Sequence, residues 1–392
     1  MNILFVLDYY QPKLGYSEHY LAKEFVRIGH NVTILTSNRF FPFPKYDSTV
    51  RKMLGSRIVG SGRKKNHGIE IIRKPVIIEA FCRTIFAGHK QVISSFHPDI
   101  VFVNGTATYN AIIISLLKPR NGFSLKTFDS HLPSEFDRTD GILKRMAYGV
   151  FRLCCSSLLN SRVDTFIAVQ DDTVQLMHMA YGVDKPIQLI DLGTDTSLFS
   201  FTAKGRKQRR AELHIKDDIV VGLYTGKIIE AKGIHILLDA FGRLEKTCPN
   251  LHLVFVGDGP QEYKDALLRL VKDGSRLHFV GIQSQENLSS WYSMADFAVW
   301  PLQDTTAMNE AASCRLPFIA NDKLGAKTRV SNNNAVLYKR GDGKNLAEKI
   351  KNLYAHPVER KKMGDRGREL VIQKLSWTKI AGEYLERVNR CK

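Results

Sequence analysis

Two lysines, Lys227 and Lys232, lie five positions apart in the segment TGKIIEAKG, directly after an apolar run that is typical of a buried strand. Two cations that converge at the end of a strand suit a diphosphate, because a diphosphate carries several anionic oxygens. The spacing alone fits an ordinary lysine pair on a solvated loop equally well. The lysines are therefore candidate diphosphate ligands, and the support for this assignment depends on the polar groups around them.

A polar loop and a carboxylate follow a later apolar run, in the segment WPLQDTTAMNEAAS. The loop holds Asp304, Thr305 and Thr306, and Glu310 comes early in the short helix predicted after it. A carboxylate at a strand end can accept hydrogen bonds from both hydroxyls of a ribose. An acid in the first turn of a helix is also common for structural reasons, since it complements the helix dipole.

Three glycines lie where a backbone could approach a bound anion closely. Gly226 begins the lysine segment, Gly257 lies in the turn VGDGP, and Gly15 precedes a predicted helix. Free amides and the helix dipole favour an anion at such a helix start. Turn formation alone would explain these glycines equally well.

The segment KTFDSHLPSE places Asp129, His131 and Glu135 after another predicted strand. An acid and an imidazole at such a point could handle protons or orient a substrate hydroxyl. A single Asp or His in a turn is more often structural, but three polar groups together make a catalytic role about as probable as a structural one.

Motifs for metals and dinucleotides are absent from the sequence. We find no HExxH, no Cys/His ligand spacing, no Asp-x-Asp and no G-x-G-x-x-G after a first strand. We therefore expect no metal or other cofactor, and the pattern argues against a nicotinamide or flavin enzyme. The six cysteines form no paired motif, no leader precedes the first strand, and no apolar run reaches the roughly 18 residues of a membrane span. These features favour a reduced, cytoplasmic setting.

The net charge of +18 predicts an anionic partner. One basic cluster (Arg51, Lys52, Arg57, Arg63, Lys64, Lys65) is expected in a long loop between two strands, where an anionic membrane surface could meet it. A second cluster (Lys204, Arg206, Lys207, Arg209, Arg210) is expected in a solvated linker. Neither cluster carries the interleaved aromatic residues of a nucleic-acid site, so nucleic acid is not expected as a partner.

Apolar runs alternate with helix-period segments twice along the 392 residues, which predicts an α/β protein with two doubly wound, mostly parallel sheets. Strands are expected at NILFVL, NVTILTS, GIEIIR, DIVFVN, LKTFD and DTFIAV in the first half. In the second half they are expected at IVVGLYTG, HLVFVGDG, LHFVG, DFAVWP and PFIAND. Ligands of such sheets bind beyond the carboxyl ends of the strands, where the candidate residues lie.

Taken together, DLGTDTSLF, TGKIIEAKG, VGDGP, MADFAVWP and NEAASCRLPFI resemble the donor domain of the family 4 retaining glycosyltransferases (glycosyl transferases group 1). The opening NILFVLDYYQPKLGYSEHYLAKEFVRIGHNVTILTS is similar to the first strand, glycine loop, helix and second strand of that family. The resemblance covers essentially the whole chain and is strongest from Gly193 to Asn321.

The resemblance implies the GT-B fold, in which two Rossmann-like domains face each other across a cleft. Residues 1–198 would bind the acceptor, residues 199–374 would bind the nucleotide sugar, and a final helix at 375–392 could cross back to the first domain. Lys227 and Lys232 would stabilise the leaving diphosphate in place of a metal.

The family pattern also assigns contacts to the sugar donor. Glu310 would hold the ribose. Gly15 would lie beside the phosphates and the sugar, and Gly226 and Gly257 belong to the two matching donor-domain turns.

The sequence departs from the family pattern at two places. Leu302 stands where the first glutamate of the paired motif is expected, so either Asp304 or the Thr305/Thr306 pair takes over its sugar contacts or the sugar is held differently. Asp129 stands at the position of a sugar-contacting histidine, and His131 follows two residues later.

The resemblance implies transfer of a sugar, with retained anomeric configuration, from a nucleotide-diphosphate sugar to a glycan or a lipid-linked acceptor. The expected location is the cytoplasm, at the inner face of a membrane. Two alternatives remain open. One is a non-catalytic GT-B scaffold that binds a sugar nucleotide or glycan, and the other is a sugar-nucleotide epimerase.

Overall fold

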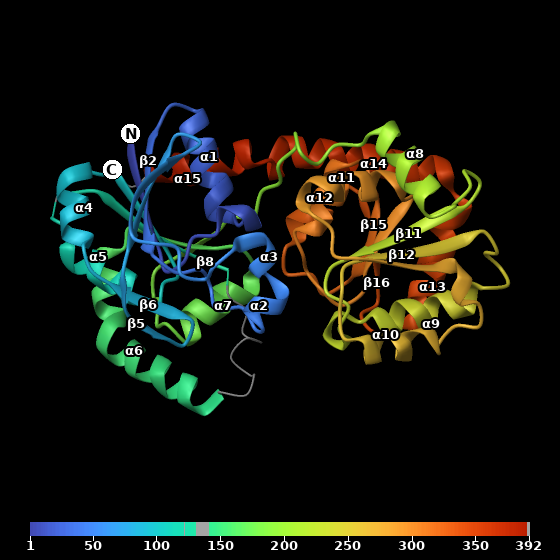
Figure 1. Ribbon diagram of the computed structural model, residues 1–392, viewed down its shortest axis with the longest axis horizontal. Coiled ribbons are helices and arrows are strands. Elements are labelled where there is room, and N and C mark those ends of the chain that lie inside the picture. The colour runs from blue at the N-terminus through green and yellow to red at the C-terminus, as the bar shows by residue number, and fades with distance from the viewer. Residues whose placement is uncertain (121, 131–140, 390–392) are drawn as a thin grey trace. The chain divides into compact units, whose positions relative to one another are not determined.

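The computed structural model describes residues 1–120, 122–130 and 141–389, and its internal contacts divide the chain into two compact units (Figure 1). Unit 1 comprises Met1–Leu192 and Ile380–Lys392, and unit 2 comprises Gly193–Lys379. The boundaries between the two domains and the final helix were expected at 198/199 and 374/375. Residues 193–199 belong to unit 2 because Phe199 lies in its core and because Arg368 donates to the carbonyls of Thr196 and Phe199.

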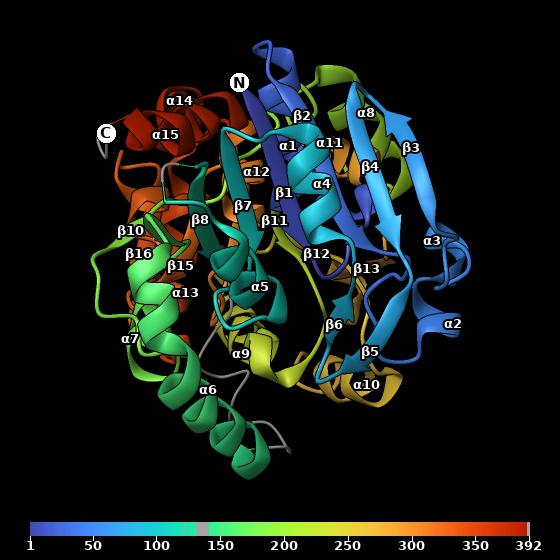
Figure 2. The same cartoon turned by 90° about the vertical axis from the view of Figure 1, so that its left-hand side faces the viewer.

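Unit 1 is built on an eight-stranded sheet in the order β10-β9-β8-β7-β1-β2-β4-β3 (Figure 2). Every strand pair is parallel except β3 with β4. The six strands expected in this half are confirmed, and β3, β10 and a separate β5–β6 hairpin were not expected. The strands are β1 (Asn2–Leu7), β2 (Asn31–Ser37), β3 (Gly62–Asn66), β4 (Ile69–Lys74), β5 (Val76–Ala80), β6 (Arg83–Phe86), β7 (Ile100–Asn104), β8 (Ser124–Asp129), β9 (Thr165–Ala168) and β10 (Ile187–Leu189).

Helices cover both faces of this sheet because successive residues of a strand point to opposite sides. Leu4 and Val6 of β1 belong to the core formed with α4 to α7, whereas the ring of Phe5 stacks with Phe25 of α1. The final helix α15 also belongs to this second layer, since Tyr384 packs on Phe102. The helices are α1 (Ser17–Arg27), α2 (Tyr46–Thr49), α3 (Arg51–Leu54), α4 (His89–Phe96), α5 (Tyr109–Leu117), α6 (Gly141–Arg162), α7 (Asp171–Met179) and α15 (Trp377–Asn389).

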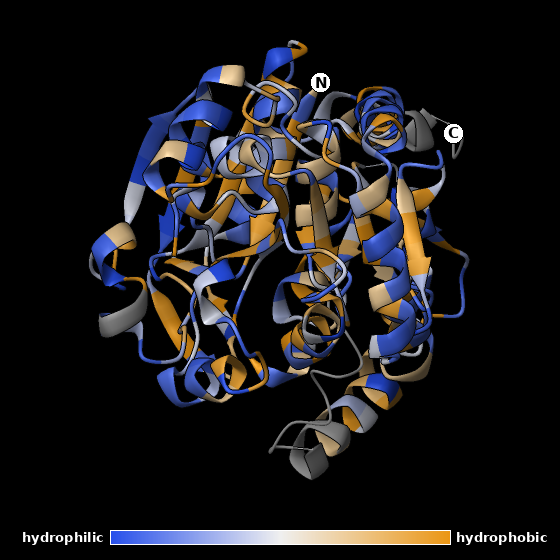
Figure 3. Ribbon diagram, turned by 90° about the vertical axis from the view of Figure 1, so that its right-hand side faces the viewer, coloured by the Kyte–Doolittle hydropathy of each residue, from blue (hydrophilic) through white to orange (hydrophobic). Residues whose placement is uncertain are grey.

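Unit 2 is built on a six-stranded, fully parallel sheet in the order β13-β12-β11-β14-β15-β16. Its strands are mostly hydrophobic, and its helices carry hydrophilic outer faces (Figure 3). The five expected strands are confirmed, and β16 is an addition. The strands are β11 (Val220–Thr225), β12 (Leu251–Val256), β13 (Leu277–Gly281), β14 (Phe297–Trp300), β15 (Phe318–Asn321) and β16 (Ala335–Tyr338). The helices are α8 (Ala203–Glu212), α9 (Ile234–Leu244), α10 (Gln261–Leu268), α11 (Gln285–Met294), α12 (Ala307–Ser313), α13 (Gly343–Ala355) and α14 (Pro357–Leu370).

The second basic cluster is not a solvated linker. It forms α8, and Arg210 is only 2% exposed, with its Nη2 2.8 Å from Oδ2 of Asp296. Arg206 also pairs with Asp296, and the guanidinium of Arg209 lies 4.6 Å from the centroid of the Trp291 ring. The linker prediction was wrong because a run of arginines was taken as exposed, whereas here the arginines fasten α8 to α11.

The first basic cluster is not a single long loop either. It contains α3 and the antiparallel edge strand β3, and Arg63, Lys64 and Lys65 lie exposed on that edge. Arg57 instead forms an ion pair with the half-buried Glu79. Only part of the cluster is therefore available to an outside partner.

Each sheet reverses its strand order once, and ligands of open α/β sheets bind beyond the carboxyl ends of the strands at that point. In unit 1 the reversal lies at β1, between β2 on one side and β7 on the other. In unit 2 it lies at β11, between β12 and β14. The candidate site residues were placed on the loops that follow these strands.

Candidate functional site

The loop after β11 carries both candidate lysines at the reversal point of unit 2. Lys227 is exposed, and its carbonyl accepts a hydrogen bond of 2.9 Å from the Tyr224 hydroxyl. Lys232 lies in a 3-10 turn that leads directly into α9. Gly233 ends this turn with φ 72°, and a Cβ there would lie 2.5 Å from Leu302 of the loop after β14. The two loops at the reversal point are therefore packed on each other.

Two glycines of the VGDGP turn fix the position of the lysine loop. A Cβ on Gly257 would lie 1.9 Å from the Gly226 carbonyl oxygen, and a Cβ on Gly259 would lie 1.8 Å from the Ile228 carbonyl oxygen. The Ile228 amide in turn donates to the Asp258 carbonyl at 2.9 Å. Glycine is thus required here by backbone packing, and this packing holds Lys227 in place whether or not Gly226 and Gly257 contact a ligand.

Glu310 lies in the first turn of α12, as expected, and its carboxyl group is enclosed. The Tyr292 hydroxyl donates to Glu310 Oε2 at 2.8 Å, and the Thr225 hydroxyl lies 3.2 Å from the Tyr292 hydroxyl. Burial raises the pKa of Glu310 to about 7. Tyr292 could not be recognised from the sequence, because it belongs to no motif and is one of several buried residues of α11. The carboxyl group of Glu310 is thereby held in one orientation next to the end of β11.

The loop after β14 is braced from within. Asp304 Oδ1 accepts from Nη1 of Arg329 at 2.6 Å, and its Oδ2 accepts from the Ala326 amide at 2.8 Å. Thr306 is the N-cap residue of α12 without a side-chain capping bond, and the Thr305 hydroxyl accepts from the Ala307 amide at 3.3 Å. Both Asp304 oxygens already have protein partners, so the two threonines are the better-placed candidates for sugar contacts.

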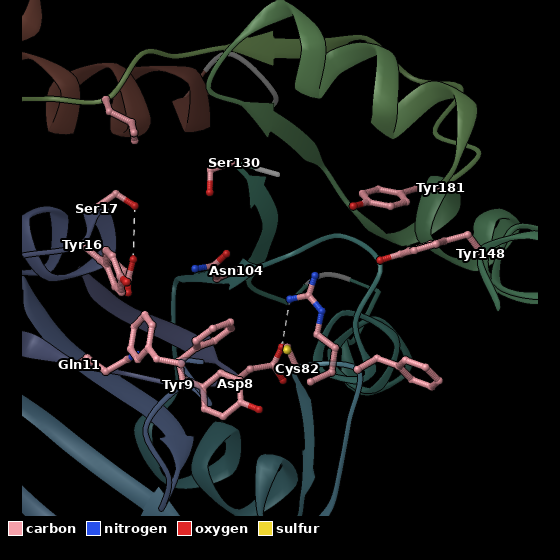
Figure 4. Close-up of a pocket in the computed structure, with 16 residues that line it drawn as sticks. Asp8, Tyr9, Gln11, Tyr16, Ser17, Cys82, Asn104, Ser130, Tyr148 and Tyr181 are labelled. Atoms are coloured by element: carbon pink, nitrogen blue, oxygen red, sulfur yellow. Dashed lines mark hydrogen bonds and ion pairs between the residues drawn. The ribbon is translucent and has the colours of Figure 1, made fainter. Parts of the chain in front are cut away.

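A pocket of about 490 Å³ lies at the reversal point of unit 1 (Figure 4). Its walls come from the loops after β1, β7 and β8, the start of α1, the β5–β6 turn and α6. Figure 4 shows Tyr148 and Tyr181 together on one side of the pocket, with Gln11 and Tyr16 on the other. The lining residues are Asp8, Tyr9, Gln11, Tyr16, Ser17, Glu18, Phe41, Phe43, Phe81, Cys82, Arg83, Asn104, Ser130, Tyr148, Tyr181 and Leu192.

The floor of this pocket is a buried ion pair. Arg83 Nη1 lies 3.3 Å from Asp8 Oδ2, and Asp8 also accepts from the Thr84 amide and from the side chain of Asn110. Burial raises the pKa of Asp8. Asp129 is fully buried, accepts from the Thr106 amide at 3.0 Å and interacts electrostatically with Arg83.

The other unit 1 candidates are placed as follows. Asp129 ends β8 one residue before Ser130, which lines the pocket. His131 and Glu135 lie outside the described residues. Gly15 adopts the left-handed conformation (φ 63°) just before α1, and its neighbour Tyr16 is the N-cap residue of that helix.

Several pocket residues were missed in the sequence analysis. Asp8 follows the first strand directly, so the rule about strand ends could have found it. Glu18 lies in the first turn of α1, where an acid is common for structural reasons, and Tyr148 and Tyr181 come from α6 and the loop after α7 without a local sequence signal. Among the described residues, no group of three His, Cys, Asp or Glu side chains could hold a metal ion, and no helix is long and apolar enough to cross a membrane.

Two family models match the chain on either side of the unit boundary. Glycosyltransferase Family 4 matches residues 17–198, and Glycosyl transferases group 1 matches residues 220–356. The chain belongs to the family 4 glycosyltransferases.

The chain spans about half the length of the curated relatives it matches. One of these is the lipopolysaccharide 1,2-N-acetylglucosaminetransferase of Salmonella typhimurium, 29% identical over 199 residues, which are 46% of this chain and 50% of the relative.

Solved structures establish the fold as GT-B. A sucrose-phosphate synthase from Thermosynechococcus elongatus superimposes with a TM-score of 0.70 at 19% identity, over 100% of both chains. Anabaena HepE, solved in complex with UDP-glucose, superimposes with a TM-score of 0.68 at 18% identity, also over 100% of both chains.

Proposed function

We propose that this chain transfers a sugar, with retention of anomeric configuration and without a metal ion, from a nucleotide-diphosphate sugar to a glycan or a lipid-linked acceptor. One observation carries the proposal. The loops after β11 and β14 bring Lys227, Lys232 and Glu310 to the strand reversal point of unit 2, the expected ligand position of such a sheet.

Each of these residues has a distinct chemical role in the proposal. The ribose hydroxyls donate to the Glu310 carboxylate, which Tyr292 orients. Lys227 and Lys232 bind the diphosphate and stabilise the negative charge that grows on it as the glycosidic bond breaks. The pocket of unit 1 receives the acceptor. HepE was solved with UDP-glucose, and this supports a uridine nucleotide as the first sugar donor to test.

We expect nucleotide diphosphate to form from at least one nucleotide sugar in excess EDTA, because the lysines supply the charge that a metal would otherwise supply. The measurement is nucleotide release by the purified chain across a panel of UDP-, GDP-, ADP- and TDP-sugars. Activity that is lost with EDTA and recovered with Mg²⁺ or Mn²⁺ would contradict metal independence. Binding without release would favour the scaffold, and conversion of the donor sugar without release would favour the epimerase.

We further propose that unit 1 docks on an anionic membrane surface through the exposed basic edge of β3. Arg63, Lys64 and Lys65 are exposed there, and each basic residue near an anionic bilayer contributes about 1 kcal/mol. Changing these three residues to glutamate is expected to abolish co-sedimentation with vesicles that contain anionic lipid at low salt.

The matched control for this change reverses the same number of charges on unit 2, at the exposed Lys351, Lys361 and Lys362. It is expected to bind vesicles nearly as well as the unmodified chain. Equal loss in both variants would mean that only net charge matters, and equal binding to neutral vesicles would exclude an electrostatic surface altogether.

A further inference from the structure

The pocket of unit 1 contains buried polar groups whose hydrogen-bonding capacity the described protein does not fill. Gln11 is 2% exposed, and its Nε2 has no hydrogen-bond partner within the described part of the chain. Glu18 is 5% exposed, and its Oε2 accepts a long hydrogen bond of 3.3 Å from the Ser17 hydroxyl. A buried donor without a partner is costly, so such a group in a pocket wall marks a place where a ligand supplies the partner.

The charge of the pocket is opposite to that of the chain. Asp8 and Glu18 line it, and Arg83 is the one cation among its described lining residues. Arg83 is already paired with Asp8 and interacts with Asp129 as well. Although the chain has a net charge of +18, the described walls of this pocket therefore offer no cation that is not already paired with a carboxylate. A phosphate group requires such a cation for tight binding.

Two further arginines lie near the pocket and do not change this balance. The Tyr9 hydroxyl donates to Glu79 at 2.8 Å, and Arg39 and Arg57 both form ion pairs with Glu79. Neither arginine is among the residues that line the pocket. Their guanidinium groups bind Glu79, and Glu79 in turn fixes the hydroxyl of Tyr9.

The remaining walls are aromatic. Tyr9 and Phe41 pack edge to face with ring centroids 5.5 Å apart, and the Phe41 and Phe43 centroids are 5.0 Å apart. Phe81 projects from the β5–β6 turn and is 65% exposed. Aromatic faces beside carboxylates and amides suit a sugar ring, which offers apolar C–H faces and hydroxyl donors at its edge.

We propose that the acceptor bound in this pocket is an uncharged sugar ring, with its hydroxyls donating to Glu18 and accepting from Gln11, and that phosphorylated acceptors are excluded. This inference rests on the proposed function and names its acceptor class. A phosphate placed about 6 Å from the Glu18 carboxylate is repelled strongly enough to lower kcat/KM at least about 100-fold relative to the uncharged acceptor.

The test compares acceptors that differ only in charge. Nitrophenyl glycosides of glucose, galactose, mannose and N-acetylglucosamine are assayed beside their 6-phosphates, as nucleotide release above the acceptor-free rate. The assay is run at pH 8, because burial raises the pKa of Glu18 to about 7 and the carboxylate must be ionised. We expect at least one uncharged glycoside to stimulate release, with its phosphate at least about 100-fold poorer in kcat/KM.

Two variants isolate the charge of Glu18. Glu18→Gln keeps the shape and removes the charge, so the preference for the uncharged acceptor is expected to shrink about 100-fold. Glu24 lies on the same helix, accepts a hydrogen bond from Arg27 and is outside the pocket. The control variant Glu24→Gln is therefore expected to keep the full preference for the uncharged acceptor. A preference that Glu18→Gln leaves unchanged would overturn the inference.

Two other outcomes would also overturn it. These are stimulation by a 6-phosphate equal to that by its uncharged partner, and no stimulation by any uncharged glycoside. Failure of the proposed function is separately visible, because it removes nucleotide release in the absence of any acceptor.

Discussion

Replacing Lys232 with alanine is expected to lower kcat about 10²–10³-fold while the fold stays intact, because a cation that stabilises a developing charge acts mainly in the transition state. Lys232 lies in a 3-10 turn between β11 and α9 that contains no buried residue, so we expect the hydrophobic core to be unaffected. The rate is measured as nucleotide release at saturating sugar donor, with circular dichroism and thermal unfolding to check the fold.

Two variants control for general effects of changing a lysine. Lys246→Ala removes an exposed lysine of the same unit, beyond the carboxyl end of α9, and is expected to leave kcat unchanged. Lys227→Arg keeps the positive charge that the proposal requires and is expected to be tolerated. Near-normal turnover of Lys232→Ala would remove this residue from the diphosphate site.

Replacing Glu310 with glutamine is expected to lower kcat/KM about 100-fold above pH 7 and to abolish the pH dependence of UDP-glucose binding. Burial raises the pKa of Glu310 to about 7, so the free protein holds this group protonated below that pH. Ribose hydroxyls favour the ionised form as their acceptor, so the dissociation constant should fall about tenfold per pH unit up to about pH 7 and then level off. Calorimetric titration between pH 5.5 and 8.5 measures this directly.

Tyr292→Phe provides the matched test of that interpretation. The Tyr292 hydroxyl bonds Glu310 and lowers the pKa of its carboxyl group, so removing the hydroxyl should move the binding transition to higher pH. A flat binding profile in the unmodified chain, or an unchanged profile in Glu310→Gln, would contradict ribose binding by Glu310.

Much of the architecture could be predicted because it depends on local apolar patterns. The apolar residues of NILFVL and HLVFV are all buried, as in central strands of parallel sheets. The edge strand β3 escaped prediction because its sequence, GRKKN, is basic and exposed, and it is defined only by its antiparallel pairing with β4. The helix α8 escaped because its arginines are satisfied by Asp296 and Trp291, partners distant in sequence.

The candidate site likewise has one part that could be predicted from the sequence and one part that could not. Glu310 and the lysines follow strands of recognisable pattern, so their place at the reversal point of the sheet could be predicted. Their supports could not be, because the hydroxyl of Tyr292 and the guanidinium of Arg329 reach the site from other elements. In unit 1, Glu18 became a candidate only when the structure placed its buried carboxyl group in a pocket wall.

A crystal structure of the chain with UDP-glucose bound, grown in EDTA, tests the central claim most directly. The account predicts both ribose hydroxyls at hydrogen-bond distance, about 3 Å, from the Glu310 carboxylate, and diphosphate oxygens in contact with Nζ of Lys227 and Lys232. A nucleotide bound elsewhere, or a diphosphate held by protein groups that include neither lysine, would contradict it.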